Sequence, residues 1–162
     1  MAFEIVTAQP EHIDQLSRLF AHAHNDYYVA FLPHFFRPVP PDFWRDRLLK
    51  ALDTPNYRIF VVLDTDHQTC AGFSEVFIRN TTVPYIIPER RLVINNIYID
   101  PHYRRRGLAS LLLEHIQHFA RQRHIFTLEL EVASVNTAAQ RLYARFGFTP
   151  RTITMEQRLS DR

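Results

Sequence analysis

The sequence predicts a mixed fold, α/β or α+β in class, in which helices pack against a mixed sheet. Short segments with alternating apolar and polar residues are separated by longer segments whose apolar residues recur at helical spacing. These segments follow the order β-α-α-β-β-β-α-β-α-β, so strands grouped in hairpins precede a strand–helix–strand unit. Such an order gives antiparallel and parallel strand pairs in one sheet.

Six strands are predicted from alternation and from β-branched and aromatic content. A turn at 64–67 joins the second and third strands into a hairpin, and a loop with two prolines follows over 80–89. Asp100 and Pro101 end the fourth strand. The predicted strands cover 3–7, 57–64, 70–79, 91–100, 126–132 and 153–159.

Four helices are predicted from their apolar stripes. Prolines open the first two, and Gly147 supplies a stop signal after the last. Between the first two helices, the segment 22–36 mixes aromatic residues and histidines without a clear period. The predicted helices begin at Pro10, cover 41–52, begin near Arg106, and cover 136–146.

Composition narrows the classes of protein to consider. With 162 residues, 46% hydrophobic and 22% charged, the chain suits a single domain over 1–162. A net charge of +2 is too small to indicate a nucleic-acid binder, and one cysteine excludes an internal disulfide framework. The N-terminus has no basic region followed by an apolar run, and no stretch approaches membrane-spanning length. We therefore expect a cytoplasmic protein without a membrane partner.

A basic joint that contains a glycine connects the strand 91–100 to the following helix. A helix start presents unpaired backbone N–H groups and the positive end of the helix dipole, which together bind anions. Arg104, Arg105 and Arg106 add positive charge, and Gly107 allows close approach to the backbone. The three glycines of the chain, at 72, 107 and 147, are too far apart for a dinucleotide-binding G-x-G-x-x-G, and no P-loop can be written. The joint predicts a phosphate-binding cradle of another kind.

Two motifs resemble those of the GNAT superfamily of acyl-CoA-dependent N-acyltransferases. Arg104-x-x-Gly107-x-Ala109 resembles the loop whose backbone amides hold the pyrophosphate of coenzyme A in that family. The stretch 136–148 resembles the pattern Asn-x-x-Ala-x-x-x-Tyr-x-x-x-Gly-Phe, with every fixed position filled. The resemblance covers about 91–159 and is greatest to the N-terminal-amine acetyltransferases, whereas the first half matches only in the order of its elements.

The resemblance implies a GNAT-like fold, with helices on both faces of a central mixed sheet. The sheet is expected to splay between two parallel strands, those that end at Asp100 and Val132. Acetyl-CoA, as cosubstrate, then inserts its pantetheine between them, in agreement with ligand binding at the carboxyl ends of parallel strands. The implied coenzyme A contacts are Ile97, Tyr98, Ile99, Arg104, Arg105, Arg106, Gly107, Leu108, Ala109 and Asn136.

Acetyl transfer to an amine requires a neutral amine, donors for the oxyanion and a proton for the departing thiolate. By resemblance, Tyr143 is the general acid, although a tyrosine here also suits the buried face of the last helix. Glu131 is the general base, acting through water. Strand alternation places Glu129 and Glu131 on one face, so both could also be merely solvated. Glu75 on an earlier strand is a substitute base, and solvent alone is a further alternative.

Asn136, besides its implied contact with pantetheine, is also suited to capping the last helix, and the two roles are compatible. No metal site is expected. His115 and His118 share a helix face, but no H-E-x-x-H motif accompanies them. Cys70 lies beside a hairpin turn and suits a structural role better than that of a nucleophile.

The sequence thus predicts an acetyl-CoA-dependent N-acetyltransferase that transfers an acetyl group to a primary amine by direct attack in a ternary complex. The acceptor is a small molecule or a peptide N-terminus, expected to lie against 22–36, the helix with Trp44 and the loop 80–89. A non-catalytic acyl-CoA-binding sensor or interaction domain is the alternative. No nucleic-acid partner is expected, since binding through Arg104–Arg106 would be a weaker and steeply salt-dependent alternative. Frequent dimers in the superfamily suggest a homodimer.

Overall fold

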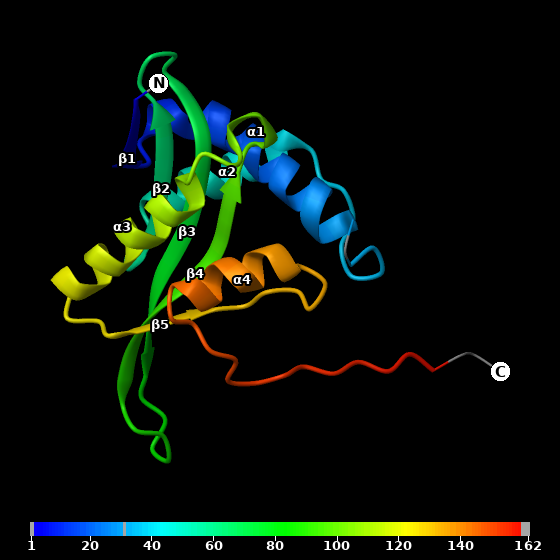
Figure 1. Ribbon diagram of the computed structural model, residues 1–162, viewed down its shortest axis with the longest axis vertical. Coiled ribbons are helices and arrows are strands. Elements are labelled where there is room, and N and C mark those ends of the chain that lie inside the picture. The colour runs from blue at the N-terminus through cyan, green and yellow to red at the C-terminus, as the bar shows by residue number, and fades with distance from the viewer. Residues whose placement is uncertain (1, 31, 160–162) are drawn as a thin grey trace.

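The protein is built on a five-stranded sheet in the order β1-β2-β3-β4-β5 (Figure 1). The structure is a computed structural model that describes residues 2–30 and 32–159. Adjacent strands from β1 to β4 pair antiparallel, whereas β4 and β5 pair in parallel, which confirms the predicted mixed sheet. The strands are β1 (Phe3–Thr7), β2 (Tyr57–Asp64), β3 (Thr69–Thr81), β4 (Glu89–Ile99) and β5 (Thr127–Leu130).

Helices cover both faces of the sheet (Figure 1). Leu48 of α2 and Phe20 of α1 belong to the core on one face, and Leu112 of α3 belongs to the core on the other, which α4 completes. Leu48 and Leu112 are fully buried, and each such side chain contributes roughly 1.5–3 kcal/mol of transfer free energy. The helices are α1 (Ile13–Ala23), α2 (Pro41–Leu52), α3 (Leu108–Gln122) and α4 (Thr137–Arg145), with shorter turns η1 (Pro10–His12), η2 (His24–Val29) and η3 (Pro101–Tyr103).

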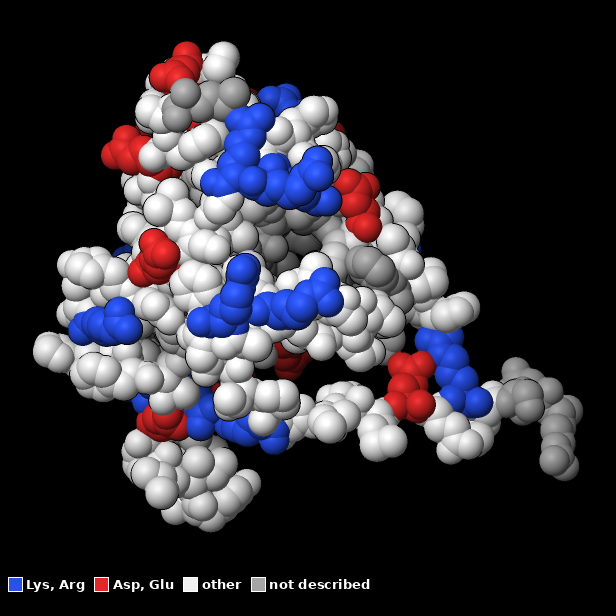
Figure 2. Space-filling model, viewed as in Figure 1, with Lys and Arg blue, Asp and Glu red and all other residues white. Residues whose placement is uncertain are grey.

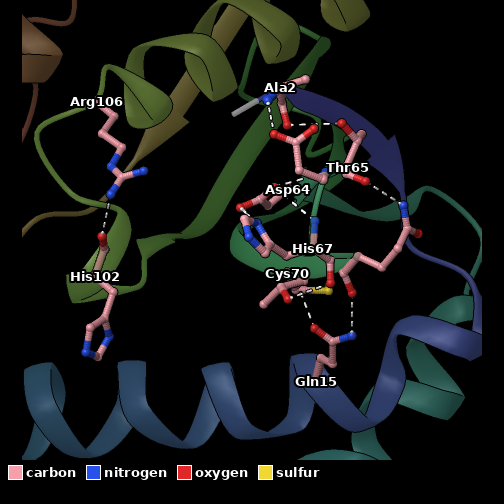
Figure 3. A network of polar contacts seen from close by, with 11 residues as sticks. Ala2, Gln15, Asp64, Thr65, His67, Cys70, His102 and Arg106 are labelled. Carbon is pink, nitrogen blue, oxygen red and sulfur yellow. Dashed lines mark hydrogen bonds and ion pairs between the residues drawn. The ribbon is translucent and has the colours of Figure 1, made fainter.

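The β2–β3 turn is fastened to α1 by a polar network (Figure 3). Gln15 donates its side-chain N–H to the carbonyl of Gln68 (3.1 Å) and accepts from the backbone N–H of Cys70 (2.8 Å). Burial raises the pKa of the Cys70 thiol to about 11, so little reactive thiolate forms at neutral pH. The structural role expected of Cys70 fits this position.

The strand predicted over 153–159 is wrong. After Phe148 the chain runs away from the body of the molecule without strand pairing (Figure 1), and Ile153 and Met155 are 84% and 90% exposed. Alternation marks a segment that can become a strand, but a strand also requires a neighbouring edge to pair with. Here the segment pairs with no strand of the described chain, although the outer edge of β5 has no strand partner there.

Several other boundaries also differ from the sequence prediction, most of them by one or two residues. β5 ends at Leu130, two residues earlier than expected, and α1 is followed directly by the π-helical turn η2 inside the segment that showed no period. None of the helices in the described part of the chain is both long and apolar enough to cross a bilayer.

Candidate functional site

The central feature of the site is an edge of β4 that lacks a strand partner. β4 pairs with β5 only over Arg91–Ile94, opposite Thr127–Leu130. From there to Ile99, the edge of β4 on this side has no strand partner in the described chain. Backbone groups of β4 that point toward this side beyond Ile94 therefore have no strand partner in the described chain. The predicted splay lies here, and Ile97, Tyr98 and Ile99 lie on the unpaired stretch.

A β-bulge in β4 aims two asparagines at the same side of the sheet. Glu75 pairs with Asn96 and Val76 with Ile94, so Asn95 is the extra residue. The side-chain amides of Asn95 and Asn96 both donate to Glu75 Oε2, at 2.7 Å and 2.5 Å. A bulge re-aims side chains in this way without ending the ladder, and bulges are frequent beside active sites.

The cradle loop has the backbone conformation that an anion site requires. Arg105 and Gly107 have positive φ angles of 62° and 78°, and Gly107 directly precedes the first residue of α3. The turn leaves the first N–H groups of α3 pointing outward, where the helix dipole also favours negative charge. Successive backbone N–H groups around a left-handed residue form a concave anion-binding surface.

The arginine side chains of this loop are held in different ways. Arg104 donates through Nε to the carbonyl of Ile99 (3.0 Å), and its guanidinium lies over the ring of Tyr98. Arg106 donates to the carbonyl of His102 at 3.3 Å (Figure 3). Arg104 therefore ties the loop to the end of β4, so the cradle and the open edge form one structural unit.

Basic side chains gather on both sides of a hollow in the molecular surface. Figure 2 shows one group over the loop before α3, a second group over α4, and the hollow between them. α4 contributes the exposed residues Arg141 and Arg145, which the sequence motif did not single out. Their helical spacing, four residues apart on one helix face, was the available signal.

Asn136 caps α4 and connects it to η2. Its Oδ1 accepts from the backbone N–H of Ala139 (3.1 Å), and its Nδ2 donates to the hydroxyl of Tyr27 (2.8 Å). The capping role considered from sequence is confirmed. A contact with pantetheine remains a prediction.

Tyr143 lies half-buried on α4, beside the core on the α3 face of the sheet. Burial, together with smaller contributions from the neighbouring Tyr27 and Tyr28, raises the pKa of its hydroxyl to about 12. The hydroxyl therefore keeps its proton at neutral pH and is able to donate it. Its ring also meets Phe148 edge to face, at 5.9 Å between centroids, so packing holds its orientation.

Glu129, the candidate base Glu131 and the substitute base Glu75 lie in different environments. Glu129 is neutralised by Arg79, Arg91 and Arg151, and the hydrogen bond from Arg79 contributes most to lowering its pKa. Glu131 directly follows β5, is exposed, and lies close enough to Tyr28 to influence it electrostatically. Of these two glutamates, only Glu131 is exposed.

Glu75 is 0% exposed and fully engaged by its neighbours. Arg47 donates to Oε1, and Asn95 and Asn96 donate to Oε2. A general base must reach the substrate or a water that contacts it, and this carboxylate reaches neither. The geometry therefore disfavours Glu75 as the substitute base.

The π-helical turn η2 contributes two tyrosines that sequence reasoning missed. Tyr28 donates its hydroxyl proton to Asn96 Oδ1 on β4 (2.9 Å), while Tyr27 accepts from Asn136 at the start of α4. The two adjacent residues therefore link β4 to α4 across the open edge. Single π-helical turns are rare and recur at functional sites, but their residues follow no 3.6-residue period.

A cavity of about 540 Å³ lies elsewhere, between α2 and β2. It is lined by Phe43, Asp46, Arg47, Lys50, Ala51, Thr54 and Tyr57, and none of the motif residues reaches it. Across residues 2–30 and 32–159, no three His, Cys, Asp or Glu side chains are arranged to hold a metal ion.

Residues 16–148 match the model of the acetyltransferase (GNAT) family. The chain belongs to the GNAT acetyltransferase family. The match extends into the N-terminal half, where the motifs alone gave no support.

Two curated GNAT relatives share parts of their sequence with this chain. The ribosomal protein bS18-alanine N-acetyltransferase of Salmonella typhimurium is 47% identical over 58 residues, covering 36% of this chain and 39% of the relative. The streptothricin acetyltransferase of Streptomyces lavendulae is 36% identical over 91 residues, covering 56% and 44%. The matches span less than half the length of both relatives.

Solved structures confirm the GNAT fold over almost the whole chain. A tetramutant of a Bacillus halodurans protein superposes with a TM-score of 0.89 at 22% identity, covering 96% of this chain and 99% of that one. The aminoglycoside N-acetyltransferase AAC(6')-Iy in complex with CoA superposes with a TM-score of 0.71 at 19% identity, covering 98% and 96%.

Proposed function

We propose that this GNAT protein transfers the acetyl group of acetyl-CoA to a primary amine by direct attack in a ternary complex. The observation that carries the proposal is the edge of β4 left open beyond Ile94, between a basic cradle and Tyr143. An acyl-pantetheine chain can supply the backbone partners that this edge lacks, and the solved neighbour with bound CoA supports this occupant.

The phosphates of acetyl-CoA are assigned to the cradle. Backbone amides from Arg105 to Ala109 lie at the start of α3, where the helix dipole and the arginine charges favour an anion. Arg141 and Arg145 on the other side of the hollow are additional phosphate partners. The pantetheine chain is then assigned to the open stretch of β4 at Ile97, Tyr98 and Ile99, with Asn136 beside it.

The acetyl group is assigned to the end of the gap near Tyr143 and Glu131. The amine nitrogen attacks the carbonyl carbon, and the C–S bond of the resulting tetrahedral adduct breaks. Tyr143 donates its proton to the departing sulfur, and Glu131 accepts a proton from the amine through a water molecule. General acid–base groups of this kind each contribute roughly 10²- to 10⁴-fold in rate.

The proposal is tested by calorimetry with acetyl-CoA together with a thiol-release assay. The amine panel should contain small polyamines, an aminoglycoside, streptothricin and peptides with a free N-terminal alanine, since relatives act on the last three kinds. We expect acetyl-CoA binding and thiol release that requires one class of amine. Binding without turnover on any amine would instead support the acyl-CoA sensor.

A further inference from the structure

The hydroxyl of Tyr28 ends a polar chain that starts at the ion pair between Arg47 and the buried carboxylate of Glu75. Arg47 donates to Glu75, and the other carboxylate oxygen of Glu75 accepts from the amide of Asn96 at 2.5 Å. The oxygen of that same amide accepts a hydrogen bond from the Tyr28 hydroxyl (2.9 Å). Four side chains from α2, β3, β4 and η2 are thus connected in one line.

The direction of each hydrogen bond in this chain is fixed. A carboxylate paired with Arg47 only accepts, so Asn96 must turn its NH₂ group toward Glu75 and its oxygen toward Tyr28. The amide oxygen has no hydrogen, so Tyr28 must donate to it. A tyrosine hydroxyl has one proton. The Tyr28 oxygen can therefore only accept a hydrogen bond from any further partner.

Tyr28 lies beside the groups assigned to the reaction. Asn96, its partner, is next to Ile97 on the open stretch of β4, and the adjacent Tyr27 is bonded to the start of α4. Tyr28 interacts electrostatically with Glu131 and with Tyr143, so the three side chains lie near one another. Tyr28 is half-buried, so part of its side chain remains accessible.

We propose that the Tyr28 hydroxyl oxygen accepts a hydrogen bond from the attacking amine and thereby makes the enzyme selective for primary amines. The inference rests on the proposed N-acetyltransferase function. A neutral primary amine has two N–H bonds and one lone pair. One N–H group donates a hydrogen bond to the Tyr28 oxygen, and the other donates to the water held by Glu131. The lone pair is then directed at the acetyl carbon.

A secondary amine cannot fill this arrangement, because in its neutral form it has a single hydrogen. With that hydrogen on the water, the Tyr28 oxygen receives no hydrogen bond from the acceptor, which costs affinity. Asn96 and Glu75 act as positioning residues. They direct the Tyr28 proton away from the acceptor but do not themselves contact the acceptor.

The test compares one primary amine from the panel with its N-methyl derivative in the wild type and in Tyr28→Phe. In the wild type we expect kcat/KM to favour the primary amine. In Tyr28→Phe, kcat/KM for the primary amine should fall roughly tenfold to a hundredfold, the value for the N-methyl amine should change little, and the selectivity ratio should approach one. The KM for acetyl-CoA should stay the same.

Thr152→Val is the control for the loss of a hydroxyl group, because Thr152 is exposed in the segment that follows α4, where none of the groups assigned to the reaction lies. Glu75→Gln is the second variant. A neutral amide at this position allows the side-chain amide of Asn96 to flip, so that Asn96 no longer fixes the direction of the Tyr28 hydroxyl. The ratio of kcat/KM for the primary amine to that for the N-methyl amine should therefore fall, by less than in Tyr28→Phe. Thermal unfolding confirms that each variant is folded.

A Tyr28→Phe enzyme that loses activity equally on both amines, or loses none, overturns the inference and assigns Tyr28 a structural role. An unchanged ratio in Glu75→Gln overturns the positioning chain. A wild-type protein that acetylates no amine overturns the proposed function itself, which keeps the two failures apart.

Discussion

The two edges of β4 differ in how completely they are paired. Toward β3 the ladder runs from Glu89 to Ile99, interrupted only by the bulge, whereas toward β5 it ends at Ile94. The paired edge stabilises the sheet, and the open edge leaves polar backbone groups available for a ligand. One strand thus combines a stabilising side with a binding side, and changes at the two edges should have separable effects.

The largest effect is expected at the open edge, from Tyr143→Phe. Removal of the hydroxyl takes away the proton donor for the thiolate while the ring keeps its packing against Phe148. We expect kcat to fall roughly 10²- to 10⁴-fold, with an unchanged dissociation constant for acetyl-CoA by calorimetry. An unchanged kcat on the preferred amine would remove Tyr143 from the mechanism.

The paired edge is tested by Gly72→Ala, which should mainly cost stability. A methyl group at Gly72 would lie 2.6 Å from the backbone oxygen of Tyr98 and from Cδ1 of Ile99. Because backbone has to move to relieve this contact, we expect the free energy of unfolding to fall by about 1–3 kcal/mol in urea. Full stability in this variant would show that the two strands separate easily.

Gly107→Ala applies a similar change to the cradle, with a smaller effect on stability. No atom lies within 4 Å of the added methyl group, but φ is +78°, a conformation that costs other residues about 1 kcal/mol. Relief of that strain would turn the loop amides, so acetyl-CoA affinity should weaken severalfold in calorimetry while kcat at saturation is kept. If the affinity is unchanged, the amides of this loop do not hold the phosphates.

The smallest effect is expected from alkaline pH. Burial raises the pKa of Tyr143 to about 12, so the acid stays protonated at pH values at which most amines have lost their proton. The kcat should therefore rise with deprotonation of the acceptor and stay level to about pH 10. A descending limb below that pH, measured at saturating acetyl-CoA, would contradict a raised pKa at the acid.

Much of the open edge could be predicted from local sequence. The run before Asp100 is apolar, the basic joint precedes a clear helical stripe, and the stretch 136–148 fills a spaced motif. These features depend on residues close together in the chain, so the strand–helix–strand unit and the loop before α3 were predicted near their observed places, whereas phosphate binding by that loop remains a prediction.

Contacts between distant parts of the chain could not be predicted in the same way. Tyr27 and Asn136 are 109 residues apart, and Tyr28 and Asn96 are 68 apart, so no local pattern marks them as partners. The bulge at Asn95 is likewise a property of two strands together. The alternation at 153–159 misled for the same reason, because pairing depends on a neighbour that the segment itself does not contain.

The extra residue at Asn95 also divides β4 into two halves of opposite phase. Before it, Leu92 and Ile94 pack toward α3; after it, Ile97 and Ile99 do so, whereas Tyr98 turns to α1 and α2. Deleting one residue here would exchange the faces of everything downstream, moving isoleucines to where tyrosine and asparagine now stand. The face of the sheet that each residue after Asn95 occupies therefore depends on the number of residues in β4 as well as on their identity.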